Sequence, residues 1–168
     1  MDATLTELFK HNLWANLRLL DACAVLSDDQ LDASAPGTFG RVRDTLVHIL
    51  GAEEHYVGLL TDRRFEDALG PGSSFPGFED LRRRAQRSGE ALITLAAQVQ
   101  PAQTLRGTRQ GRPYAVAAGI PLVQAINHGT EHRAHVVTTL SGLGIPPTGL
   151  DAWAYGEARG LVDFGAST

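Results

Sequence analysis

Hydrophobic residues recur at helical spacing in four long segments of the chain, and polar residues fill the positions between them. This periodicity is typical of amphipathic helices that each bury one face. Pro121 suits the first turn of the last of these helices, and Gly142 or Gly144 suits its end. Four such helices joined by loops predict an all-α fold, a four-helix bundle. The predicted helices cover residues 3–26, 42–60, 81–99 and about 121 to 142 or 144.

The segments between these helices have the composition of loops or extended chain. Residues 27–40 contain glycine and proline, with room for one helical turn after Ser27. Residues 63–77 are long enough for either a lid over a site or a mobile connection. Residues 104–117 predict a short hairpin or an extended crossover, which would permit a parallel return before the last long helix. A short closing segment is expected over residues 150–164, where Trp153 and Tyr155 can pack across the bundle end.

Length and composition indicate one soluble globular domain over residues 1–168. The chain is 43% hydrophobic and 20% charged, and its net charge of −4 argues against a general nucleic-acid binder. No apolar run is long enough to cross a bilayer, and the N-terminal residues do not resemble a signal peptide. A single cysteine, Cys23, excludes an internal disulfide framework and suits a reducing compartment. We therefore expect a cytoplasmic protein.

The histidines of the last long helix are candidate metal ligands. His128 and His132 lie four residues apart, so they share one helix face, and His135 follows three residues later on the same face. Such a pair can clamp a divalent metal, although a solvated polar stripe or a core histidine has the same spacing. His48 lies at the margin of the apolar face of the 42–60 helix, and His55 lies on the same edge. If the two faces meet, His48 supplies a third nitrogen, and three protein ligands plus water are typical of a reactive site.

Several polar residues fall on helix faces that are predicted to be buried. Asn12 and Asn16 interrupt the apolar stripe of the first helix, where they either face a polar pocket or hydrogen-bond a neighbouring helix end or buried water. Glu53 and Arg133 both point to the apolar sides of their helices, so we expect them to pair. The arginines of the 81–99 helix are predicted to lie mainly on its outer side: Arg82, Arg83, Arg84 and Arg87. They form either a solvated charged face, which is the simpler interpretation, or a binding site for an anionic ligand.

Three short motifs follow one another along the chain: Trp14-Ala-Asn16, Leu46-Val-His48-Ile followed by Glu53, and Asn127-His128-Gly-Thr-Glu-His132-Arg133. In this order and spacing, they are similar to those of the DinB-like (DinB/YfiT) bundle proteins. The resemblance covers nearly the whole chain and implies a four-helix bundle with up-down-down-up topology. It also implies a divalent metal site formed by His48, His128 and His132. The family often has glutamine at the position of His135. This histidine is therefore an outer-shell donor, a proton shuttle, an additional ligand or a residue without a role in the site. The same alternatives apply to His55.

The resemblance further implies a function and partners. Homodimers are common in this family, and some members use a metal-bound low-molecular-weight thiol, such as bacillithiol or mycothiol, in transferase or isomerase reactions. Zinc or nickel fits three neutral histidines best. The sequence offers no identifiable general base for hydrolysis, which favours transfer of a thiol to a small electrophile over a metal-dependent hydrolase. In that case, residues 63–77 and the hairpin would shape the acceptor pocket. A non-catalytic metal-binding module of the stress response is the other alternative.

Overall fold

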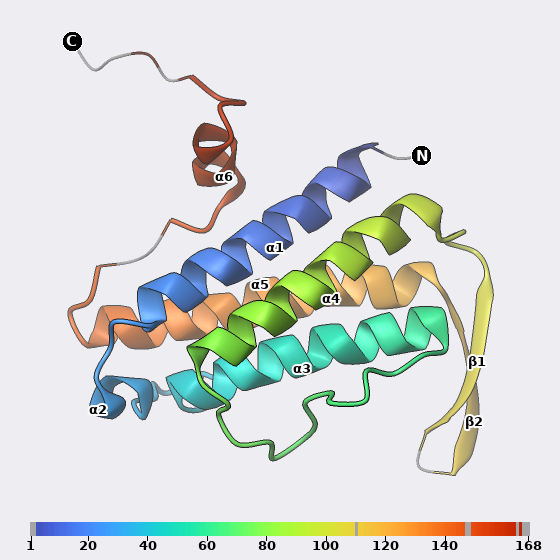
Figure 1. The fold of residues 1–168 in the computed structure, drawn as a ribbon, viewed down its shortest axis with the longest axis horizontal. Coiled ribbons are helices and arrows are strands. Elements are labelled where there is room, and N and C mark those ends of the chain that lie inside the picture. The colour runs from blue at the N-terminus through green and yellow to red at the C-terminus, as the bar shows by residue number, and fades with distance from the viewer. Residues whose placement is uncertain (1–2, 110, 147–148, 164, 166–168) are drawn as a thin grey trace.

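The computed structural model describes residues 3–109, 111–146, 149–163 and 165, which contain six helices and a two-stranded sheet (Figure 1). Most of this chain is helical, which confirms the helical class predicted from the periodicity. The long helices are α1 (Ala3–Cys23), α3 (Val42–Thr61), α4 (Phe78–Gln98) and α5 (Gly119–Gly142). The short elements are α2 (Asp28–Leu31), α6 (Ala152–Ala158), β1 (Thr104–Arg109) and β2 (Arg112–Ala117). Within these described ranges, no helix is both long and apolar enough to span a bilayer.

The element boundaries agree with the periodicity to within about three residues. α1 ends at Cys23 rather than at residue 26, and α4 begins at Phe78 rather than at residue 81. The single turn expected after Ser27 is α2, where Ser27 and Gln30 form a reciprocal capping box. Pro147 and residue 164, which belong to the predicted end of the last long helix and to the closing segment, lie outside the described residues.

The four long helices lie side by side, with α1 packed mainly on α4 and α3 packed on both α4 and α5 (Figure 1). Their apolar faces meet in two clusters of buried side chains. One cluster is centred on Leu19, Leu46 and Leu81, and the other surrounds Phe9 and Leu92 near the opposite end of the helices. Burying one such side chain contributes about 1.5–3 kcal/mol, so these clusters hold the four helices together.

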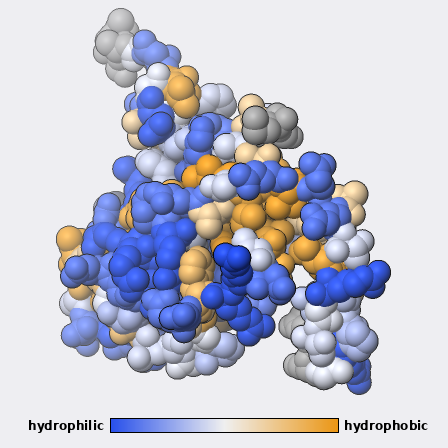
Figure 2. Space-filling model, turned by 45° about the vertical axis from the view of Figure 1, so that its right-hand side comes forward, coloured by the Kyte–Doolittle hydropathy of each residue, from blue (hydrophilic) through white to orange (hydrophobic). Residues whose placement is uncertain are grey.

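The parallel return occurs at a different connection from the one expected. α1 and α5 run in one direction and α3 and α4 in the other, so the 62–77 loop makes the parallel connection (Figure 1). The strands β1 and β2 form an antiparallel hairpin with Thr104 opposite Ala117. This pairing brings the end of α4 next to the start of α5 and makes those two helices antiparallel. The hairpin itself projects from the helices (Figures 1 and 2).

Two of the four arginines predicted on the outer side of α4 point inward instead. Arg84 is only 6% exposed and donates from Nη1 to Oε1 of the buried Glu54 at 3.0 Å. Arg87 pairs with the same carboxylate. The second oxygen of Glu54 accepts the backbone N–H of Leu69 at 2.8 Å. Because a buried charge must be paired, Glu54 draws both arginines inward and thereby anchors the 62–77 loop against α3 and α4.

The C-terminal segment packs along α1 rather than across the end of the helices. The ring of Tyr155 in α6 contacts the rings of Trp14 and His11, each at 5.6 Å between centroids. Its hydroxyl donates to Oε1 of Glu7 at 2.6 Å. Trp153 does not take part in the core as expected, because it is 68% exposed. Tyr155 is therefore the buried aromatic residue that joins this segment to α1.

Candidate metal centre

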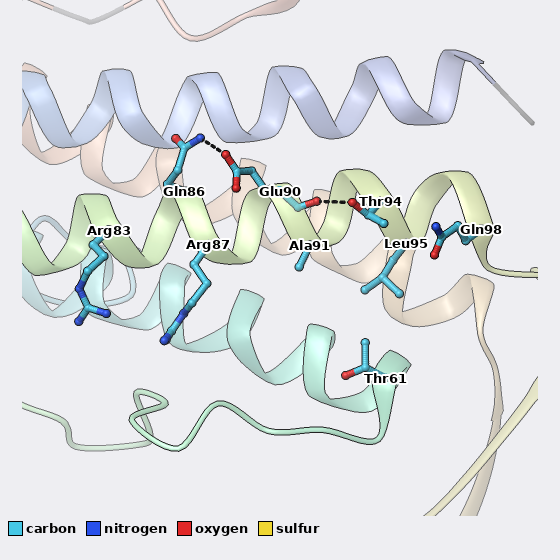
Figure 3. A pocket seen from close by; sticks show the side chains of 9 residues that line it. All are labelled: Thr61, Arg83, Gln86, Arg87, Glu90, Ala91, Thr94, Leu95 and Gln98. Atoms are coloured by element: carbon cyan, nitrogen blue, oxygen red, sulfur yellow. Dashed lines mark hydrogen bonds between the residues drawn. The ribbon is translucent and has the colours of Figure 1, made fainter.

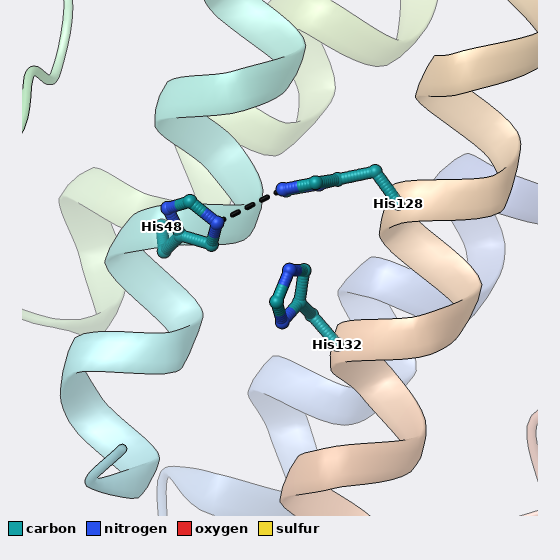
Figure 4. Close-up of side chains that lie close together, drawn as sticks. All are labelled: His48, His128 and His132. Atoms are coloured by element: carbon teal, nitrogen blue, oxygen red, sulfur yellow. Dashed lines mark hydrogen bonds between the residues drawn. The ribbon is translucent and has the colours of Figure 1, made fainter. Parts of the chain in front are cut away.

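Three histidines from two helices converge on one point in the structure. His48 comes from α3, and His128 and His132 come from successive turns of α5 (Figure 4). Their candidate ligand atoms all lie within 4.8 Å of one another, and the Nε2 atoms of His48 and His128 are 2.9 Å apart. In the described part of the chain, no other group of His, Cys, Asp or Glu side chains converges in this way. The histidines converge because α3 and α5 pack against each other in antiparallel directions. The edge of the apolar face of one helix, where the histidines lie, is then next to the same edge of the other helix.

The three imidazoles are held in their neutral form, which is the form that binds metals. Burial lowers the pKa of His48. Burial, followed by the proximity of His132 and His48, lowers the pKa of His128 to about 4. Burial also lowers the pKa of His132, which is 8% exposed. Near pH 7 each ring therefore has an unprotonated nitrogen available, and three neutral nitrogens fit zinc or nickel better than a hard cation.

The phenyl ring of Phe39 covers one side of this cluster. It stacks on His48 with centroids 4.0 Å apart and an angle of 11° between planes, and its edge meets His132 at 5.0 Å. Phe39 remains 48% exposed, so it lies between the imidazoles and solvent. The sequence reasoning missed this residue because it lies in a loop outside any periodic pattern. The only signal available was a lone aromatic residue between Gly37 and Gly40.

Tyr56 and Gln124 lie beside His128 on the side of the cluster away from Phe39. The rings of Tyr56 and His128 meet edge to face at 6.1 Å between centroids, and the Gln124 side chain lies close to the Tyr56 hydroxyl. Burial raises the pKa of Tyr56, whereas the polar Gln124 side chain lowers it. Sequence analysis placed Tyr56 only on an apolar helix face, because its polar partner lies on another helix.

The two remaining histidines of α3 and α5 differ in their placement. Nδ1 of His135 lies 3.2 Å from Nδ1 of His132, so one of these nitrogens donates and the other accepts. A hydrogen bond of this kind fixes the tautomer of His132 and leaves Nε2 for a ligand. His55 is exposed and is not one of the three converging histidines. Of these two candidates for an outer role, the structure therefore brings only His135 next to the cluster.

The predicted pair of Glu53 and Arg133 takes a bridged form. Both residues are buried, and the side chains of Asn12 and Asn16 lie between them. Both asparagines are thus engaged by Glu53 and Arg133 in the middle of the helices, and a role for them beside a ligand pocket stays a prediction. Burial raises the pKa of Glu53, and its contacts with the asparagines, Ser88 and Arg133 lower it. Burial lowers the pKa of Arg133 to about 10.

An open groove lies on a different part of the surface, along the outer face of α4 (Figure 3). Its volume is about 700 Å³, and Arg83, Arg87, Glu90 and Thr94 are among the residues that line it. Its two arginines are already paired with acidic side chains. The 62–77 loop is held against α3 and α4 by Glu54, Arg84 and Arg87. The residues that flank the histidines are instead Phe39 and Tyr56. The expectation that this loop shapes a pocket at the histidines is therefore not supported by its contacts.

Packed long helices with three neutral imidazoles at a helix–helix seam define a helical protein with a candidate metal centre. A model described as the DinB family matches residues 1–160 of the chain. The protein therefore belongs to the DinB family. A comparison with curated proteins gave no match.

Proposed function

We propose that His48, His128 and His132 hold one divalent ion, with zinc or nickel as the best-fitting metals. The convergence of three neutral imidazoles at a partly exposed seam is the observation that carries this proposal. Three protein nitrogens leave at least one coordination position for an external ligand, as in catalytic rather than structural zinc sites. His135 would act from outside the ligand set by fixing the tautomer of His132.

The proposal extends to the activity. We propose that the protein is a thiol S-transferase, with a low-molecular-weight thiol of the bacillithiol or mycothiol type as cosubstrate and a small electrophile as acceptor. A bound divalent ion would supply deprotonation of a coordinated thiol, which otherwise has a pKa of about 8.5. Phe39 would shield the reacting groups from water on one side. Cys23 would take no part, because it is buried and burial raises the pKa of its thiol to about 12.

The arrangement of the chain supports the topology, the homodimer and the cytoplasmic location that belong to the proposal. The directions of the four long helices fit the up-down-down-up bundle, formed as a single domain over residues 1–168. Exposed apolar side chains on α1 and α5 support a homodimer, because such side chains are costly to leave in water. Leu8, Ile120 and Val123 are 42%, 58% and 65% exposed, respectively. A free, buried cysteine is compatible with the reducing cytoplasm, where a thiol cosubstrate would remain reduced.

Thiol transfer is favoured over the two alternative functions. A hydrolase needs a general base beside the attacking water, and His135, the nearest additional histidine, is already engaged by His132. A non-catalytic metal-binding module of the stress response would use a filled coordination shell, whereas the converging set provides three donors. The three histidine nitrogens, at a half-buried seam between two helices, therefore fit a metal site that can bind an external ligand.

The test is to load the purified protein with zinc or nickel and to add bacillithiol, mycothiol or glutathione with a general electrophile. Conjugate formation is followed by mass spectrometry. We expect turnover in the wild-type protein and in Cys23→Ala, and no turnover in His128→Ala. If metal binds but no thiol perturbs the spectrum of the cobalt-substituted protein and no conjugate forms, the transferase proposal is wrong and the non-catalytic module is favoured.

A further inference from the structure

A row of side chains extends the candidate centre along the seam between α3 and α5. Gln124, His128 and His132 recur every four residues on one face of α5, and His48 and Tyr56 lie eight residues apart on α3. Because the two helices are antiparallel, Tyr56 lies at the Gln124 end of this row and Phe39 lies at the His132 end. The three imidazoles are thus bracketed by two aromatic rings.

The two rings differ in what they offer to a neighbouring molecule. Tyr56 has a hydroxyl, which can donate its proton to an oxygen acceptor. Gln124 is exposed and lies beside Tyr56, which places this end of the row at the outer edge of the seam. Phe39 offers no polar atom but presents a flat ring that is 48% exposed. One end of the row is therefore a hydrogen-bond donor and the other is an apolar surface.

The distances place both features within reach of a molecule bound at the histidines. Phe39 lies 4.0 Å from the His48 ring and Tyr56 lies 6.1 Å from the His128 ring, between centroids. Gln124 and His132 are eight residues apart on α5, so the row is about 12 Å long at 1.5 Å per residue, and a small aromatic molecule bound at the central histidines can reach toward both ends. A large aromatic residue that stays half in solvent forgoes burial energy, and contact with a ligand would recover it.

We infer that Tyr56 and Phe39 are substrate-binding residues that select a small molecule with a planar apolar group and an oxygen that accepts a hydrogen bond. Tyr56 donates its hydroxyl proton to the oxygen, and Phe39 packs against the planar group. This inference names the class of electrophilic substrate that the site would take, and it rests on the metal centre of the proposed function. It requires no change in the ligand set, since neither residue is one of the three converging histidines.

The test uses the cobalt-substituted protein and two oxygen ligands, acetohydroxamate and benzohydroxamate, which differ by an aromatic ring. Their affinities are measured from the visible spectrum of cobalt, so that no catalytic activity is needed. We expect the wild-type protein to bind benzohydroxamate more tightly. Tyr56→Phe should weaken both ligands by about three- to tenfold, the effect of one hydrogen bond. Phe39→Leu should reduce the preference for benzohydroxamate by about three- to tenfold.

Controls separate this inference from the proposal on which it rests. Tyr114→Phe removes a hydroxyl from the projecting hairpin and should leave both affinities unchanged. Thermal melting and cobalt content show whether each variant folds and is loaded. Absence of cobalt uptake by the wild-type protein would overturn the metal centre together with this inference. Cobalt uptake with unchanged hydroxamate affinities in Tyr56→Phe and Phe39→Leu would overturn this inference alone.

Discussion

Glu53 and Arg133 are joined through two asparagines in the interior of the protein. Asn12 and Asn16 donate to Oε1 of Glu53 at 2.6 and 2.7 Å, and their carbonyl oxygens accept from Nη1 of Arg133 at 2.7 and 2.8 Å. Ser88 of α4 donates to the other oxygen of Glu53 at 2.9 Å. All four long helices therefore contribute to one buried polar network. Since Arg133 adjoins His132 in the sequence, this network also fixes the position of α5 at the candidate centre.

The network predicts strong coupling between Glu53 and Arg133 although two amides separate them. Removing one member of a buried charged pair costs about 3–5 kcal/mol, because the other charge remains buried. Glu53→Gln and Arg133→Met should each lower the free energy of unfolding by an amount of this order. The double variant should lose less than the sum, with a coupling of about 1–3 kcal/mol in urea denaturation. The exposed pair Glu7 and Lys10 is the control, with coupling below about 1 kcal/mol. Additive losses at Glu53 and Arg133 would show that the asparagines do not transmit the interaction.

Metal should stabilise the folded protein through the three histidines. A ligand that binds only the folded state at about 100 times its Kd adds roughly 2.7 kcal/mol of stability. We expect zinc or nickel to raise the Tm of the wild-type protein, with little or no shift in His132→Ala. His55→Ala is the matched control, because His55 is on α3 but outside the converging set, and it should behave like the wild type. Full metal occupancy in His132→Ala would contradict the assignment of this ligand.

The lowered pKa of His128 predicts that the metal-free protein loses stability in mild acid. The pKa is about 4 in the folded protein and about 6.5 ordinarily, so between these values the unfolded chain binds more protons. Stability is therefore fully retained above pH 6.5 and falls as the pH decreases toward 4. The urea midpoint of the metal-free protein, measured from pH 7.5 to 4.5, should decrease in this window. His128→Gln should show a smaller decrease, and an unchanged slope in this variant would exclude His128 as the cause.

Gly129 should be intolerant of a side chain. A Cβ at this position would lie 2.9 Å from Nη1 of Arg133 and 2.9 Å from Oδ1 of Asn12, closer than real Cβ contacts. Gly129→Ala would displace the polar network and should cost about 1–3 kcal/mol of folding free energy. Gly142→Ala is the matched control on the same helix, where a Cβ would meet nothing within 4 Å. Comparison of the two melting temperatures checks the prediction, and equal Tm values would show that the network adapts.

Helical periodicity allowed the four long helices to be predicted from the sequence, because each helix buries one face and that requirement acts on every turn. It also placed His128 and His132 side by side, since residues four apart on one helix are neighbours whatever the rest of the chain does. The burial of Glu53 and Arg133 followed from the same periodicity. These are local consequences of helix geometry, so they needed no knowledge of how the helices pack.

Contacts between helices depended on packing that no local pattern contains. The approach of His48 to the α5 histidines requires α3 and α5 to be antiparallel neighbours, and the asparagine bridge requires side chains of α1 to reach both of these helices across the interior. Arg84 points inward because Glu54 on another helix must be neutralised, which its position on α4 does not reveal. Phe39 reaches His48 from an irregular loop, and Tyr56 meets His128 on a different helix. Each of these contacts joins segments far apart in the chain, and only the packing of the whole molecule brings them together.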